Sequence, residues 1–304
     1  MAPRWIWRLL SAPGLLFLGV FFLVAFYAVV AVGMGNVTTL FEPVPYWNPL
    51  DWNVGYLLQA LEDLAPGGQT WPVVVRTVLY IVVAMTLSLL IGYPVAYYAA
   101  RYAGRWSGPI LVLLVLPFWI SYIMRMFAWT NLLSTDGYAA EALNALGIDQ
   151  LFNTLGLMDG DDWLGGQPIT VILALVYGYV PFFILPLYST LERIDGRFIE
   201  AGRDLGASSF QTFLRVTLPL SVPGLMAASV VTILPMFGDY YTNSYLTSGS
   251  PKTEMVGNQV EYYLRIVGQP QRGASLVLVL MAMLFVLMVY YMVTTIRQQQ
   301  AADR

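Results

Sequence analysis

Six apolar stretches follow one another along the chain, and shorter segments that carry most of the charged residues separate them. Each stretch is long enough to cross the ~30 Å hydrocarbon core of a bilayer, which takes about 20 helical residues. We expect membrane-spanning helices over six ranges: Pro13–Met34, Pro72–Ala100, Pro109–Leu132, Ile169–Leu191, Leu220–Tyr241 and Gly273–Ile296. The pattern predicts an all-α integral membrane protein, whose transmembrane domain covers residues 13–296.

The first apolar stretch follows Arg4 and Arg8, as the apolar region of a signal peptide would. Its apolar run, Leu15–Val32, exceeds the roughly 7–15 residues of such a region, and no convincing cleavage site follows it. We therefore expect a retained membrane anchor.

The basic residues of the loops predict the orientation, because Arg and Lys concentrate on the cytoplasmic side. With the N-terminus inside, ten basic residues are cytoplasmic: Arg4, Arg8, Arg101, Arg105, Arg193, Arg197, Arg203, Arg215, Arg297 and Arg304. The outer loops receive Lys252, Arg265 and Arg272, while Arg76 and Arg125 fall within spans. We expect a cytoplasmic N-terminal segment 1–12, a cytoplasmic loop 192–219 and a cytoplasmic tail 297–304.

The composition agrees with a membrane location and narrows the chemistry. Hydrophobic residues make up 58% and charged residues 11% of the chain, against about 25% charged in a soluble domain. Without Cys or His, disulfides, Cys/His metal sites and His- or Cys-dependent catalysis are excluded. Lys252 lacks the glycine spacing of a phosphate-binding loop. We expect no enzyme activity, no catalytic or metal-binding residues and no cofactor in this chain.

Two ionisable residues near the outer ends of spans are candidates for a substrate pathway, since charges are costly there. Asp239 is followed by Tyr240 and Tyr241, a setting that can hold an ammonium group by charge and cation–π attraction. Arg125, with Trp129 one helical turn on, could line or gate the pathway. Structural explanations stay open: Arg125 could reach the interface, the tyrosines could be an interfacial belt, and an Asp239–Arg125 ion pair would explain both charges.

The loop 192–219 predicts two short helices that are broken near Gly206, where glycine can adopt the left-handed conformation that ends a helix. Pro219 then begins the next span. An apolar stripe recurs at helical spacing: Phe210, Phe213, Leu214 and Thr217. Such a stripe could lie on the membrane surface or dock into a groove of another protein.

A motif in this loop resembles the EAA motif of ABC-importer permease subunits. The chain has Glu200, Ala201 and Gly202, then three residues, Gly206, nine residues, and "VTLP" at Val216–Pro219. Gly202 replaces the second alanine and Val216 replaces isoleucine. Glycine costs about 1 kcal/mol of helix propensity relative to alanine, so we expect the first helix to be less rigid.

Two further segments, "PFWISYIMRMFAWTNLL" and "GDYYTNSYL…GNQVEYYL", are similar to permeases of the spermidine/putrescine type, and the resemblance runs from about Val73 to the sixth span. It implies a type I ABC-importer fold in the bacterial inner membrane, a second homologous permease subunit, an ATPase dimer that binds ATP and magnesium, and an extracytoplasmic substrate-binding protein, with no nucleic acid. It assigns coupling to the ATPase to Glu200, Ala201 and Gly206. We add their neighbours in the loop as candidate coupling residues: Gly202, Leu205, Phe210, Leu214 and Pro219.

The expected cargo is a small cationic solute. The resemblance and the acidic outer loops favour a polyamine, but the chain has "YLTSGS" where the family often has "LLGG" after the fifth span. Other small amines, such as aminoethylphosphonate or an opine, stay open. A self-sufficient channel or secondary transporter would predict more charges at mid-membrane or an inverted repeat. The sequence contains neither pattern.

Overall fold

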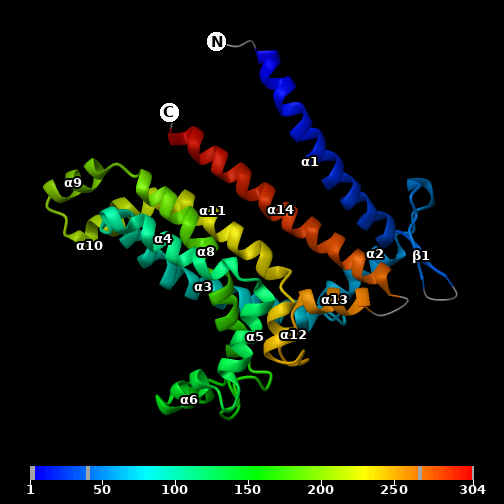
Figure 1. Ribbon diagram of the computed structural model, residues 1–304. Coiled ribbons are helices and arrows are strands. Elements are labelled where there is room, and N and C mark those ends of the chain that lie inside the picture. Colours follow the sequence, from blue (N-terminus) through cyan, green and yellow to red (C-terminus); the bar gives the residue numbers. More distant parts are fainter. Residues whose placement is uncertain (1–3, 39–41, 266–268, 303–304) are drawn as a thin grey trace. The chain divides into compact units, whose positions relative to one another are not determined.

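The computed structural model describes residues 4–38, 42–265 and 269–302 (Figure 1). Arg304 and residues 1–3 of the expected cytoplasmic ends lie outside the described residues. The chain divides into two compact units, one of Met1–Trp71 with Gln259–Leu287 and one of Pro72–Asn258 with Met288–Arg304.

The first unit is helical apart from a short hairpin, in which β1 (Asn36–Val37) pairs antiparallel with β2 (Pro43–Val44). Its helices are α1 (Arg4–Gly33), η1 (Pro49–Asp51), α2 (Gly55–Leu64) and the first part of α14 (Pro270–Ala302). Arg272 pairs with Asp63 at 3.0 Å, and Ser275 donates to the carbonyl of Gly33 at 2.9 Å. These contacts join α14 to α1 and α2.

The second unit contains the remaining elements of the chain. They are α3 (Trp71–Arg101), η2 (Gly104–Trp106), α4 (Ser107–Val115), η3 (Leu116–Trp119), α5 (Tyr122–Leu133), α6 (Tyr138–Ala145), α7 (Ile148–Thr154), α8 (Pro168–Arg193), α9 (Gly196–Asp204), α10 (Ser209–Thr212), η4 (Phe213–Thr217), α11 (Leu218–Phe237) and α12 (Tyr241–Leu246). Of these, η4 is a π-helix. The boundary between the two units falls within α13 (Val256–Arg265), after Asn258.

Helices α3, α8 and α11 form the core of the second unit through small residues that allow close approach. A Cβ added at Gly92 of α3 would lie 2.7 Å from the ring of Phe183 on α8. A Cβ at Gly224 of α11 would lie 2.1 Å from Oγ1 of Thr190, also on α8. Small residues at such contacts are typical of helices packed within membranes, where van der Waals contact drives association.

Four helices are long and apolar enough to cross a membrane: Leu10–Gly33, Trp71–Arg101, Pro168–Arg193 and Ser209–Phe237. They confirm the first, second, fourth and fifth predicted spans. The sixth predicted span lies on α14, where the apolar stretch found is the shorter Pro270–Val286. A count of six spans is therefore not reached within the described residues.

The third predicted span, Pro109–Leu132, is not a straight helix but a sharply broken one. The chain bends by 88° between Gly104–Trp119 and Tyr122–Leu133, which together form at most one broken span. Pro117 opens the 3₁₀ turn η3, and Ile120 then takes an extended conformation with ψ 136°. The side chain of Ser121 accepts from the amide of Met124 at 3.3 Å and starts α5 afresh. A proline followed by a new helix cap thus replaces the continuous helix.

Candidate functional site

The segment that resembles the EAA motif folds as two helices, α9 and α10, joined by a tight turn at Gly206. Gly206 has φ +84°, its amide donates to the carbonyl of Arg203, and the amide of Ala207 donates to the carbonyl of Gly202. This is the Schellman arrangement, which ends a helix with a left-handed residue. Ser208 and Gln211 then form a capping box at the start of α10. Both helices and the break near Gly206 are confirmed, as is Pro219 in the first turn of α11.

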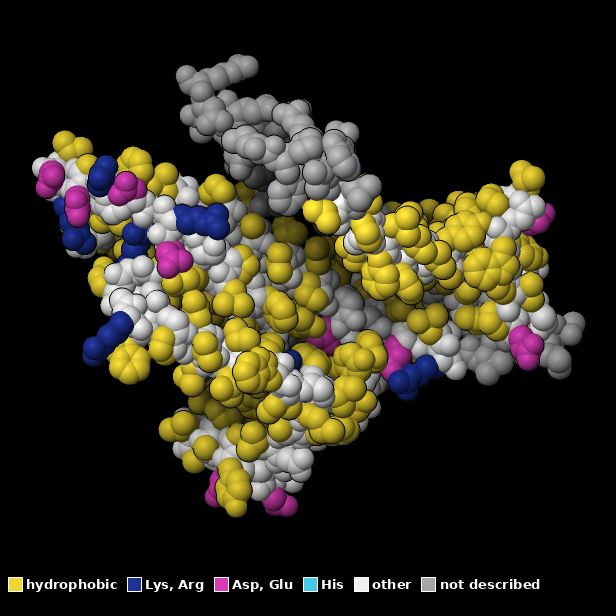
Figure 2. All heavy atoms as spheres, turned by 45° about the horizontal axis from the view of Figure 1, so that its top comes forward, with side chains coloured by type: hydrophobic (Ala, Val, Ile, Leu, Met, Phe, Trp, Pro, Cys, Tyr) yellow, Lys and Arg dark blue, Asp and Glu magenta, His cyan; other side chains and the backbone are white. Residues whose placement is uncertain are grey.

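The outer surface of this hairpin is exposed and carries both charged and apolar side chains. Figure 2 shows Lys, Arg, Asp and Glu gathered at the left end of the molecule, where α9 and α10 lie. Leu205, at the turn, is 89% exposed, and Phe210 is 69% exposed. Glu200 and Ala201 are exposed as well. The residues assigned to coupling are therefore largely accessible in the described chain.

The prediction of one apolar stripe on this segment is wrong. Phe210 and Leu214 point outward, whereas Phe213 packs edge-on against Tyr93 at 5.6 Å between ring centroids, and Thr217 is buried. The segment is also not one α-helix, since Phe210 belongs to α10, whereas Phe213, Leu214 and Thr217 belong to the π-helix η4, which has more residues per turn.

Gly202 lies at the contact between α9 and the start of the next helix. A Cβ at this position would meet Cγ2 of Thr212 at 3.3 Å and Cγ2 of Val216 at 3.5 Å. Thr212 is buried, and its hydroxyl donates to the carbonyl of Ser208. Besides lowering helix propensity, Gly202 therefore allows the two arms of the hairpin to approach closely.

At the opposite end of α11, Asp239 forms the centre of a buried polar cluster. Its side chain is 3% exposed. One carboxylate oxygen accepts from the amide of Thr242, and the other accepts from the hydroxyls of Tyr122, Tyr179 and Thr242, all at 2.9 Å. Four donors on one buried carboxylate satisfy it well, because charged acceptors form the stronger hydrogen bonds. Tyr122 reaches Asp239 from α5 and Tyr179 reaches it from α8.

Arg125, on α5, lies among aromatic rings and forms no ion pair with an acidic residue of the described chain. Its side chain is 8% exposed, and its guanidinium carbon lies 4.2 Å from the ring centroid of Phe118, 5.0 Å from that of Tyr122 and 5.8 Å from that of Tyr177. Nε and Nη1 are buried and have no hydrogen-bond partner among the described residues. The Asp239–Arg125 ion pair is absent from the ion pairs of the described chain, and Tyr122 contacts both residues instead.

The other predicted pathway residues surround these two. The ring of Tyr241 lies 4.0 Å from that of Tyr240 and 6.1 Å from that of Tyr122. Trp129 packs edge-on against Tyr177 at 5.2 Å. The structure thus brings the predicted residues of α5 and the α11–α12 junction into one aromatic cluster.

Sequence reasoning missed the side chains that organise this cluster: Phe118, Tyr122, Tyr177, Tyr179 and Thr242. The best available signal is "YGY", residues 177–179, in which a glycine separates two tyrosines on α8. A Cβ at Gly178 would lie 2.9 Å from the ring of Tyr122, so this glycine lets α5 bring Tyr122 against α8.

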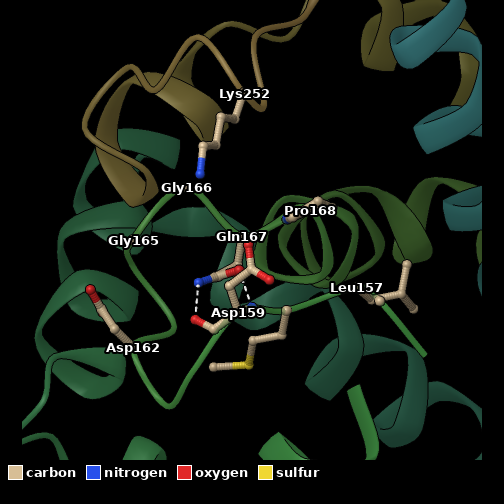
Figure 3. Close-up of a pocket in the computed structure, with 10 residues that line it drawn as sticks. Leu157, Asp159, Asp162, Gly165, Gly166, Gln167, Pro168 and Lys252 are labelled. Carbon is tan, nitrogen blue, oxygen red and sulfur yellow. Dashed lines mark hydrogen bonds between the residues drawn. The ribbon is translucent and has the colours of Figure 1, made fainter. Parts of the chain in front are cut away.

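A pocket of about 280 Å³ opens between two loops on the predicted outer side (Figure 3). The side chain of Gln167 accepts from the backbone amide of Asp159 and donates to its carbonyl, both at 2.9 Å, which fixes one wall of the pocket. Lys252 extends toward Gly166 from the other loop. Arg76, predicted within a span, donates to three carbonyls of this second loop, those of Pro251, Lys252 and Glu254. The acidic residues here form no cluster of three suited to a metal ion within the described residues.

The broken span, the exposed hairpin and the buried charges define a membrane subunit of a transporter. The chain belongs to the family of binding-protein-dependent transport system inner membrane components, which it matches over residues 4–300. It is thus the permease component of an ABC importer of the inner membrane, and not an enzyme.

Curated relatives agree with this family. The spermidine/putrescine transport system permease protein PotB of Haemophilus influenzae is 33% identical over 294 residues, covering 94% of this chain and 89% of that protein. PotB of Escherichia coli is 32% identical over 210 residues, covering 69% and 72%.

Two crystal structures share the fold at low identity. A bacterial ABC transporter that imports the acidic polysaccharide alginate matches with a TM-score of 0.56 and 17% identity, covering 97% of this chain and 98% of its own. The alginate transporter in complex with a pentasaccharide-bound periplasmic protein matches with a TM-score of 0.62 and 14% identity, covering 94% and 92%.

Proposed function

We propose that this chain forms, with a second homologous permease, the translocation path for a polyamine of the spermidine/putrescine class. The observation that carries the proposal is the 31–33% identity to PotB permeases over about 70% or more of the chain. The site agrees with it, because the buried carboxylate of Asp239 lies among tyrosine rings. Carboxylate and aromatic faces are the groups that attract ammonium ions.

In this proposal the α9–α10 hairpin inserts into a groove of an ATPase dimer, and an extracytoplasmic binding protein delivers the cargo. Two features support the hairpin's role. Its apolar side chains Leu205 and Phe210 are exposed, and backbone hydrogen bonds hold its turn at Gly206. Exposed apolar anchors next to charged residues are typical of helical segments that dock into a partner's groove.

The direct test is uptake by the assembled transporter in proteoliposomes. With the chain, its partner permease and the ATPase reconstituted, and the binding protein outside, radiolabelled spermidine or putrescine should accumulate only when ATP is inside. Absence of ATP-dependent polyamine uptake, with the complex intact, would refute the cargo assignment. Uptake by the chain alone without ATP would refute the coupling to an ATPase and favour a secondary transporter.

An amine that also carries an anionic group is the second candidate cargo, and Arg125 is the observation that favours it. Its two unpaired donors could bind a phosphonate or carboxylate, as in aminoethylphosphonate or an opine. Competition assays with these compounds against labelled spermidine separate the two. A polyamine transporter should be inhibited by putrescine and not by aminoethylphosphonate.

The proposed orientation has the N-terminal segment, the loop 192–219 and the C-terminal tail in the cytoplasm. The chain lacks cysteine, so an introduced cysteine is a unique label. In intact cells a membrane-impermeant maleimide should modify a cysteine at Asp161 and spare one at Ser208, both of which are exposed. The reverse labelling would overturn the orientation.

A further inference from the structure

The rings around Arg125 form an aromatic cage that three separate elements build. Phe118 comes from η3, Tyr122 from α5 and Tyr177 from α8, and the guanidinium carbon lies 4.2–5.8 Å from their ring centroids. Further rings hold the cage in place: Phe182 packs edge-on against Phe118 at 5.8 Å, and Trp129 packs against Tyr177. Cages of this kind bind ammonium and guanidinium groups through the negative faces of the rings.

Arg125 is held in this cage mainly by the ring faces. Its Nε and Nη1 donate to no acceptor in the described chain, and no described carboxylate lies within ion-pair distance of it. Arginine ordinarily forms paired hydrogen bonds with carboxylates and keeps its charge when buried. Because Nε and Nη1 of Arg125 donate no hydrogen bond, the guanidinium can leave the cage without breaking one at these atoms.

The nearest acidic group acts on the cage and not on Arg125. Asp239 accepts the hydroxyl hydrogen of Tyr122, whose ring is one wall of the cage. A hydrogen bond from a phenol to a carboxylate increases the electron density of the ring, and the attraction between ring and cation grows with that density. The cluster is thus arranged to favour a cation at this position.

We infer that the cage of Phe118, Tyr122 and Tyr177 is a binding site for an alkylammonium group of the cargo, and that Arg125 is the resident cation that the cargo displaces. The inference rests on the proposed import of a cationic cargo. Two positive charges cannot share one small, weakly hydrated site, because their repulsion increases as the local dielectric constant falls. Cargo and Arg125 therefore compete, and Arg125 returns to the cage when the cargo leaves.

Equilibrium binding of labelled spermidine to the purified transporter in nanodiscs tests the competition. Arg125→Gln should tighten binding about tenfold, an effect within the range of desolvated cation–π contacts, whereas Arg125→Lys should stay near the parent. Adding Phe118→Ala to Arg125→Gln should remove the gain. The matched control is Arg105→Gln, because Arg105 lies 5.9 Å from the ring of Trp106 at an exposed site on the predicted cytoplasmic side. Unchanged or weaker binding by Arg125→Gln would overturn the inference.

A second arm does not depend on the identity of the cargo. In Arg125→Ala the cage is empty, so guanidinium chloride at low millimolar concentration should raise the unfolding temperature of the complex, and equimolar urea should not. The double variant Arg125→Ala/Phe118→Ala should lose this rescue. If guanidinium does not raise the unfolding temperature of Arg125→Ala, the inference that the cage binds a cation is overturned. If spermidine binds to no variant but guanidinium raises the unfolding temperature of Arg125→Ala, the cargo assignment is refuted and the cage is supported as a cation-binding site.

Co-purification tests whether Arg125 has a structural role at the interface with the second permease. If Arg125→Gln loses the second permease during purification, Arg125 contributes to the interface with that subunit, and the inference is overturned.

Discussion

The two ends of α11 carry charged residues in opposite ways. At the hairpin end, Glu200 and its neighbours are exposed, and the local fold is held by backbone turns and caps. At the other end, Asp239 is buried and receives four hydrogen bonds from side chains and backbone. The hairpin keeps its surface available to another protein. The hydrogen bonds of Asp239 all come from within this chain, so we expect a substitution there to change both the stability of the fold and the uptake of cargo.

The largest effect should come from Asp239→Asn. The amide nitrogen of asparagine donates, so it opposes the hydroxyls of Tyr122 and Tyr179 and leaves buried donors unsatisfied, at about 1–3 kcal/mol each. We expect a lower unfolding temperature of the purified complex and at least a tenfold loss of uptake, equivalent to ~1.4 kcal/mol. Asp136→Asn, at an exposed site on the same predicted side, is the control. Parent-like stability of Asp239→Asn would show that the cluster is dispensable.

Gly206→Val should separate coupling from folding. A β-branched residue at φ +84° costs roughly 1–2 kcal/mol or more in the left-handed region, although no atom would obstruct its Cβ. We expect the hairpin turn to open, uptake to fall several-fold and the unfolding temperature to change little, because the turn is exposed. Gly206→Asn, which tolerates this conformation, should keep most activity. Normal uptake by Gly206→Val would remove the turn from the coupling pathway.

The smallest effect should come from Gly202→Ala, where two contributions oppose each other. Alanine gains about 1 kcal/mol of helix propensity, but its Cβ would lie 3.3 Å from Cγ2 of buried Thr212. We expect a net change in unfolding free energy below about 1 kcal/mol. Thr212→Ser keeps the hydroxyl and removes the crowded methyl group, so the double variant should be more stable than Thr212→Ser alone. If the double variant is less stable, the contact and not the propensity determines the residue at this position.

The helices could be predicted where the sequence carries one clear signal, such as a long apolar run or a glycine that ends a helix. Four long apolar runs became four spans. The α9–α10 hairpin was predicted from Gly206, because a glycine between two short helical segments favours the left-handed conformation that ends a helix. The break after Trp119 was not predictable, because Pro117 alone also occurs in helices that merely kink. It needs Ser121 as a new cap, and that serine is inconspicuous in the sequence.

The candidate site was predicted in part for a related reason. Asp239 and Arg125 are conspicuous because charges are rare in the apolar stretches. Their partners are not, since tyrosine is common in this chain and Tyr122 lies 117 residues from Asp239. Only the packing of α5 against α8 selects Tyr122, and Gly178 makes that packing possible. The stripe of Phe210 and Phe213 failed similarly, because a π-helix has no clear sequence signature.

The bend after Trp119 also restricts what can surround this part of the protein. At 1.5 Å per α-helical residue and about 2.0 Å per 3₁₀ residue, Gly104–Trp119 extends about 28 Å, slightly less than the ~30 Å of hydrocarbon in a bilayer. The backbone leaves the helical pattern at Ile120 and Ser121, and acyl chains cannot solvate peptide groups that lie within the hydrocarbon. Trp119 and Ile120 are exposed in this chain. Wherever this short stretch lies within the hydrocarbon, its backbone must therefore face either protein or water in the working transporter.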